Sequence, residues 1–245
     1  TGNVAEPGDV QRWIEEAHGV FGRIDAVYAN AGYGMTCPAM DMTVDEQRAM
    51  FDVNYFGTVH LLRGAMPYLA TTPDGLKHML ICSSCLSELG PPASGVYAAT
   101  KAAQDMLAQS MRAELAPEGF RVTSVHPVGT RTEFFEQAKR MSPPSPEAVG
   151  GSGKSSGGGS GGGGRMEPPD FFMQDAEKVA KRIVGALRKP CAEVWPMRTA
   201  RLIAALATAL PGPTAWALRK GYEKELAKSR PKPPGPSEPR PEGSA

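Results

Sequence analysis

The chain has 245 residues with 27 basic and 26 acidic side chains, a formal net charge of +1, and 41% hydrophobic residues. This balance suits a globular core and gives no reason to expect a nucleic-acid partner. The four cysteines are too few for a disulfide scaffold, the first residues do not resemble a secretion signal, and the longest apolar stretch, Leu202–Leu210, is too short to cross a bilayer. We therefore expect a cytoplasmic protein.

The first part of the chain alternates between helical and strand patterns. Apolar residues recur at helical spacing over Asp9–Phe21, and Ile24–Ala29 is a short apolar run typical of a buried strand. The sequence TVDE, which begins at Thr43, is a capping box and predicts a helix to about Leu69. A second buried strand is expected over Leu76–Ser84.

The same alternation continues along the rest of the chain. The patterns predict a helix, a strand, an amphipathic helix and a short strand, which are Val96–Ala116, Arg121–Pro127, Gln174–Leu187 and Ala192–Pro196. Helical patterning interrupted by Pro-Gly-Pro follows over Arg201–Lys228. Strands that alternate with helices of this length form parallel βαβ units, so the predicted fold class is α/β.

Composition divides the chain into segments. Residues 142–170 are rich in glycine, serine and proline, which predicts a flexible connection. Residues 229–245 are rich in proline and charge, which predicts a disordered tail. We therefore expect one folded domain, made of residues 1–141 and continued by the helices and last strand of residues 171–228.

Three polar residues are placed where they could act together. Tyr97 and Lys101 are four residues apart on a predicted helix and therefore share a face. A nearby ammonium group favours the phenolate and so lowers the pKa of a tyrosine, which can then exchange a proton with an alcohol or carbonyl oxygen. Ser84 follows a buried strand, where ligand sites form in open parallel sheets. Its hydroxyl could hydrogen-bond the same oxygen.

The surrounding segments resemble a known family. IDAVYANAG, FDVNYFG, ICSSCLSELG, VYAATKAA and HPVGTRTEF occur in the order and at the distances found in the short-chain dehydrogenase/reductase family. The resemblance extends from about Asn3 to Phe135 and implies a partial Rossmann-type, doubly wound parallel sheet with flanking helices, of which residues 1–141 would be the C-terminal part. It also implies hydride transfer between NAD or NADP and a small alcohol or carbonyl substrate.

The resemblance implies a role for each matching residue. Tyr97 would be the general acid/base, Lys101 would lower the pKa of Tyr97 and hold the nicotinamide ribose, Ser84 would orient the carbonyl, and Asn54 would support a water-linked proton relay. The residues implied to bind the cofactor follow the first and third strands or belong to the Tyr-Lys pair: Asn30, Ala31, Gly32, Tyr97, Lys101, Pro127, Gly129, Thr130 and Thr132. No metal site is expected, and Cys82 and Cys85 are interpreted as buried thiols.

The sequence also departs from the family pattern. Val128 replaces the glycine expected after Pro127, and Asn3 stands where an aspartate is common. The family's first strand, glycine-rich phosphate loop and second βα unit have no counterpart, so we expect the chain to be a fragment. By itself it should bind NAD or NADP weakly and self-associate through the exposed edge of the Ile24–Ala29 strand.

Two alternatives to the oxidoreductase hypothesis remain open. The chain could be a non-catalytic fragment or a scaffold that binds no dinucleotide and dimerises through the helices that begin at Thr43 and Val96. A homo-oligomer is expected in either case. A weaker alternative is contact of the Arg201–Lys228 region with a membrane surface, because Trp216 there lies close to basic residues such as Arg219.

Overall fold

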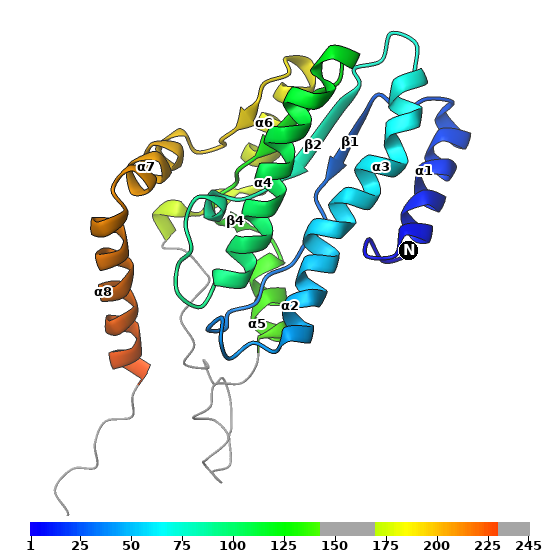
Figure 1. Ribbon diagram of the computed structural model, residues 1–245. Coiled ribbons are helices and arrows are strands. Elements are labelled where there is room, and N and C mark those ends of the chain that lie inside the picture. Colours follow the sequence, from blue (N-terminus) through cyan, green and yellow to red (C-terminus); the bar gives the residue numbers. More distant parts are fainter. Residues whose placement is uncertain (143–169, 230–245) are drawn as a thin grey trace, which may run out of the picture.

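The computed structural model describes residues 1–142 and 170–229, which contain a four-stranded parallel sheet (Figure 1). The strands lie in the order β1-β2-β3-β6, and their bounds are Ala26–Ala29, His78–Cys82, Arg121–Val125 and Glu193–Val194. Consecutive strands along this order are joined by helical connections, as parallel pairing requires. The α/β class is therefore confirmed, although each strand is shorter than its apolar run.

Helices cover the two faces of this sheet. Figure 1 shows α1 (Pro7–Phe21), α3 (Gly57–Thr71) and α4 (Gly95–Leu115) side by side over one face. Along β2, Met79 and Ile81 belong to the core cluster that these helices share. Leu80, between them, packs instead with α6 (Ala176–Arg188). Because successive side chains of a strand point to opposite faces, α6 lies on the other face, as in a doubly wound sheet.

The helix predicted from Thr43 is interrupted. The capping box is formed, and α2 (Val44–Phe51) begins directly after Thr43. A π-helical segment, Asp52–Phe56, then joins α2 to α3. In a π-helical segment the backbone hydrogen bonds span five residues instead of the four of an α-helix, and such segments are frequent at functional sites. This one contains the buried residue Asn54.

Several further elements complete the described part of the chain. They are β4 (Thr130–Arg131), α5 (Phe134–Met141), β5 (Gln174–Asp175), α7 (Arg198–Ala209), α8 (Pro211–Ser229) and three short 3-10 helices at Cys85–Ser87, Ala116–Glu118 and Asp170–Phe172. In Figure 1, α8 extends away from the sheet. None of the helices in the described part of the chain has the length and apolar character needed to cross a membrane.

The predicted connection and tail lie almost entirely outside the described residues. Only their boundary residues are placed. Ser142 accepts a hydrogen bond from the Thr36 backbone N–H at 2.8 Å, Asp170 begins a 3-10 helix, and Ser229 ends α8. The division into a domain, a connection and a tail stays a prediction.

The strand register brings the predicted site residues to one edge. Ala29 at the end of β1 pairs with Ile81 of β2, and Cys82 at the end of β2 pairs with Val125 at the end of β3. The segments that follow these three strands therefore leave the sheet at the same edge, which is the usual ligand site of an open parallel sheet.

Candidate active site

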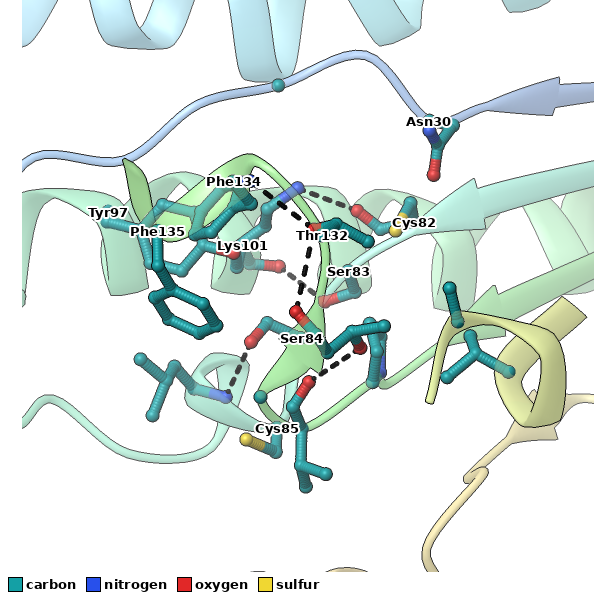
Figure 2. A pocket seen from close by; sticks show the side chains of 18 of the residues that line it. Asn30, Cys82, Ser83, Ser84, Cys85, Tyr97, Lys101, Thr132, Phe134 and Phe135 are labelled. Atoms are coloured by element: carbon teal, nitrogen blue, oxygen red, sulfur yellow. Dashed lines mark hydrogen bonds between the residues drawn. The ribbon is translucent and has the colours of Figure 1, made fainter. Parts of the chain in front are cut away.

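A cavity of about 820 Å³ opens at this carboxyl edge. Most of the residues predicted to form the site line it: Asn30, Gly32, Ser84, Tyr97, Lys101, Pro127, Gly129, Thr130 and Thr132. Figure 2 shows that Asn30, Ser84 and Tyr97 come from different elements of the fold. Ala31 instead lines a second cavity of about 140 Å³, and Asn54 is fully buried outside the lining of the main cavity.

Tyr97 occupies the first turn of α4 and is 7% exposed. Its ring packs against Phe134 with the ring centroids 5.7 Å apart. Burial raises the pKa of the phenol above its ordinary value, and a hydrogen bond with the Ser84 side chain opposes this only in part. Tyr97 is therefore protonated at neutral pH in the free site. The lowering of its pKa by Lys101 stays a prediction.

Lys101 is one turn further along α4 and is 3% exposed. Its Nζ donates to the Cys82 carbonyl oxygen at 2.7 Å and to Gln104 Oε1 at 2.9 Å, and it lies 5.7 Å from the centroid of the Tyr97 ring. Burial lowers the pKa of this ammonium group. An ammonium group has three N–H donors, and the described residues accept from two of them, which leaves one donor for a ligand in the cavity that Lys101 lines.

Asn54 is held by both its side chain and its backbone. Its Oδ1 accepts from the Tyr33 backbone N–H at 2.9 Å, and its Nδ2 donates to the Tyr33 carbonyl oxygen at 2.9 Å and to Thr100 Oγ1 at 3.0 Å. The Asn54 carbonyl oxygen accepts from Thr58 Oγ1 at 2.9 Å and from Gln104 Nε2 at 2.7 Å. A carbonyl oxygen has two lone pairs, and these two bonds use both.

Gln104 therefore joins Lys101 to Asn54. It is fully buried and also donates to Thr58 Oγ1 at 2.6 Å. It belongs to none of the sequence motifs described above. Its spacing of three residues from Lys101, which places both side chains on one helix face, was the available signal. Its second partner, Asn54, is 50 residues away in the sequence, and local spacing could not indicate it.

Hydrogen bonds to neighbouring elements help to fix the loop after β2. Ser84 Oγ accepts from the Leu86 backbone N–H at 3.1 Å, and Ser83 Oγ donates to the Lys101 carbonyl oxygen at 3.0 Å (Figure 2). The Cys85 backbone N–H donates to the Pro127 carbonyl oxygen at 3.0 Å. These bonds tie the ends of β2 and β3 to α4, so the Ser84 hydroxyl is held next to Tyr97.

Cys82 at the end of β2 and Cys85 in the loop that follows are free thiols. Burial raises the pKa of Cys85 to about 11, so its thiol is protonated and unreactive at neutral pH. Cys82 contributes its backbone carbonyl oxygen to the site, where it accepts the hydrogen bond from Lys101 Nζ.

Gly32 allows the chain to pass close to the buried site residues. A Cβ atom at this position would lie 2.9 Å from Asn54 Oδ1 and 3.5 Å from Lys101 Nζ. A side chain would therefore displace one of these groups or fill the space in front of them. The absence of a Cβ keeps this part of the cavity wall open next to Lys101.

One part of the cavity wall is apolar. Its lining residues come from the 3-10 helix after Ser84 and its loop, from α5 to α7 and from the 3-10 helix before β5: Leu86, Leu89, Phe134, Phe135, Phe172, Val179, Ile183, Ala200, Ile203 and Ala204. A ligand that fills this part would bury mostly hydrocarbon, which is favourable in proportion to the area removed from water.

The family model of the short chain dehydrogenases matches residues 1–143. The oxidoreductase asL5 of Sarocladium schorii is 34% identical over 137 residues, which is 56% of this chain and 54% of that protein. An uncharacterized oxidoreductase of Staphylococcus epidermidis is 37% identical over 116 residues, which is 47% of this chain and 50% of that protein. The chain thus spans about half the length of these curated relatives.

Two solved structures share the fold. An alcohol dehydrogenase from the archaeon Thermococcus sibiricus, complexed with 5-hydroxy-NADP, has a TM-score of 0.59 and 22% identity, covering 78% of this chain and 70% of that one. A 3-ketoacyl-(acyl-carrier-protein) reductase from Brucella melitensis, complexed with NADH, has a TM-score of 0.51 and 24% identity, covering 57% and 59%.

The match to the family model covers more than half of the chain and includes the segments around Asn54, Ser84, Tyr97 and Lys101. The chain belongs to the short-chain dehydrogenase family. The resemblance drawn from the sequence motifs is confirmed.

Proposed function

We propose that the cavity is the active site of an NAD- or NADP-dependent oxidoreductase in which Tyr97 exchanges a proton with the oxygen of an alcohol or carbonyl substrate. The observation that carries the proposal is the meeting of Tyr97, Ser84 and Lys101 at one cavity wall. Two named relatives are oxidoreductases, and two proteins of the same fold were solved with nicotinamide nucleotides.

The cavity has features that suit the nicotinamide end of such a cofactor. The wall at Gly32 has no side chain in front of Lys101, and hydroxyl or amide groups of Asn30, Thr130 and Thr132 lie along the lining. These residues, with the remaining N–H donor of Lys101, would hold the nicotinamide and its ribose. When bound, the cofactor supplies or accepts the hydride.

The protein residues would handle the proton. In the reducing direction the substrate oxygen gains negative charge, and hydrogen bonds from the Ser84 and Tyr97 hydroxyls would stabilise that charge. Because burial keeps the pKa of Tyr97 high, the phenol enters the reaction protonated and can donate its proton as a general acid. The phenolate that remains would lie near the Lys101 ammonium, which favours it.

A direct side-chain connection joins Lys101 to Asn54, while the water-linked relay that the resemblance implies stays a prediction. Gln104 bridges the two residues and occupies the Asn54 carbonyl oxygen together with Thr58. We infer that Gln104 holds Lys101 in position and links it to Asn54 through its side-chain amide.

The proposal is tested by nucleotide binding and turnover of the chain with Tyr97→Phe beside a matched control. Tyr33→Phe is suitable because Tyr33 lines the same cavity and holds Asn54 through its backbone alone. Tyr97→Phe should lower turnover by about 10²–10⁴-fold with little change in nucleotide affinity, while Tyr33→Phe should leave both nearly unchanged. Equal turnover of Tyr97→Phe and Tyr33→Phe would overturn the proposal.

A further inference from the structure

Helix α7 turns its large apolar side chains toward solvent. Its buried residues are Ala200 and Ala204. Leu202, Leu206 and Leu210, at the end of the helix, are 62%, 53% and 53% exposed. Their four-residue spacing places them on one face, and the two buried alanines lie on the opposite face. A helix that buries small residues and exposes large ones is the reverse of the usual pattern, and such surfaces mark interaction sites.

Basic residues lie at both ends of this apolar surface. Trp216 of α8 is 60% exposed and extends the apolar character past the α7–α8 corner. Residues 198–227 contain five basic and two acidic side chains, with Arg198 and Arg201 before the apolar stretch and Arg219, Lys220 and Lys224 after it. The ion pairs of Arg201 and Arg219 with Glu193 and Glu223 are exposed and weak, so these side chains stay available to an anionic partner.

The same helix forms a wall of the main cavity. Ala200, Ile203 and Ala204 line it, and Ile203 is also 45% exposed at the surface. The apolar surface of α7 is therefore continuous with the apolar part of the cavity. A cavity that is continuous with a binding surface suits a ligand that is carried by whatever binds to that surface.

We propose that the corner formed by α7 and α8 binds the surface of an anionic lipid bilayer. The apolar side chains would enter the boundary between headgroups and acyl chains, where tryptophan is favoured, and the basic side chains would pair with lipid phosphates and carboxylates. A second copy of the chain is a poorer partner because it would bring the same excess of basic side chains, which repel one another. The anionic headgroups of the bilayer carry the charge opposite to that of these basic side chains.

The test is flotation of the full chain with two kinds of vesicles, phosphatidylcholine alone and phosphatidylcholine mixed with phosphatidylserine. The chain should float with the mixed vesicles and lose this binding at high salt, because screening weakens exposed charge interactions. Leu202→Glu with Leu206→Glu should abolish flotation. Val20→Glu with Met40→Glu is the matched control, since these side chains are 75% and 94% exposed elsewhere and the added charge is the same.

The binding readout does not require turnover, so the outcome is independent of the proposed enzymatic function. Equal flotation of the two double variants would overturn the proposal. It would also be overturned if the unmodified chain failed to float and sedimented as a dimer that Leu202→Glu with Leu206→Glu dissociates, because a second copy would then cover this surface. Both double variants change exposed side chains, and circular dichroism verifies that each retains its helical content.

Discussion

Lys101 Nζ and Gln104 Oε1 lie 2.9 Å apart in the buried centre of the site, and the Gln104 amide continues from there to the Asn54 carbonyl oxygen. The lysine is thus positioned by a side chain three residues further along its own helix. That side chain is itself fixed by the π-helical segment between α2 and α3. The position of the ammonium group depends on contacts between distant parts of the chain.

Replacing Gln104 should therefore disturb both the fold and the site. Gln104→Leu leaves a buried ammonium and a buried carbonyl each short of a partner, and we expect a loss of about 1–3 kcal/mol in the free energy of unfolding. Turnover should fall and its pH dependence should change, because the pKa of Lys101 responds to its neighbours. Gln104→Glu keeps an acceptor for Lys101 and should restore part of the pH profile. If both variants keep the original pH profile, Gln104 has only a packing role.

Lys101→Met should reduce turnover and nucleotide affinity together. The substitution removes the positive charge that favours the Tyr97 phenolate and the donor expected to hold the nicotinamide ribose. Titration of NADH or NADPH by fluorescence, combined with turnover, separates the two effects. Lys139→Met, on α5 at the exposed surface, is the control. A loss confined to one of the two quantities would contradict the double role.

Gly32→Ala should harm the site and the stability of the protein. The new Cβ would lie 2.9 Å from Asn54 Oδ1, closer than side chains normally approach, and overpacking of this kind costs about 1–3 kcal/mol. Gly19→Ala in α1 is the matched control because its Cβ would meet no atom within 4 Å. That change should instead stabilise the helix by about 0.5–1 kcal/mol. Thermal unfolding of the two variants should shift in opposite directions.

Stability should fall in mild acid because of His78. This residue is fully buried, its Nε2 is 2.8 Å from Thr123 Oγ1, and its Nδ1 has no hydrogen-bond partner among the described residues. Burial, helped by the charge of Arg121, lowers its pKa to about 4 from an ordinary value near 6.5. The unfolded chain therefore binds the proton more readily between these values. The contribution of the neutral His78 to the free energy of unfolding is complete above about pH 6.5 and is lost as the pH falls toward 4.

Urea unfolding measured across this pH range checks the His78 prediction. His78→Leu should flatten the dependence of the free energy of unfolding on pH between about 6.5 and 4. Met79→Leu, which changes a fully buried side chain of β2 that does not titrate, should leave the slope unchanged. A slope that persists in His78→Leu would assign the effect to another group.

The sequence by itself determined the α/β class, the order of the strands along the chain and the family. Periodicity and capping depend on residues close in sequence, so the capping box at Thr43 and the shared helix face of Tyr97 and Lys101 could be predicted correctly. The position of Ser84 just after a buried strand also follows from a local pattern, and the structure places it beside Tyr97 at the cavity.

Only the tertiary structure decided how the site is supported and what surrounds it. The partnership of Gln104 with Asn54 joins residues 50 positions apart, and the π-helical segment that carries Asn54 interrupts a stretch that reads as one continuous helix. The pattern of α7 indicates a helix with an apolar face but not the direction of that face. Its direction depends on which side packs against the rest of the fold, and in this protein the buried side is the one with the small residues Ala200 and Ala204.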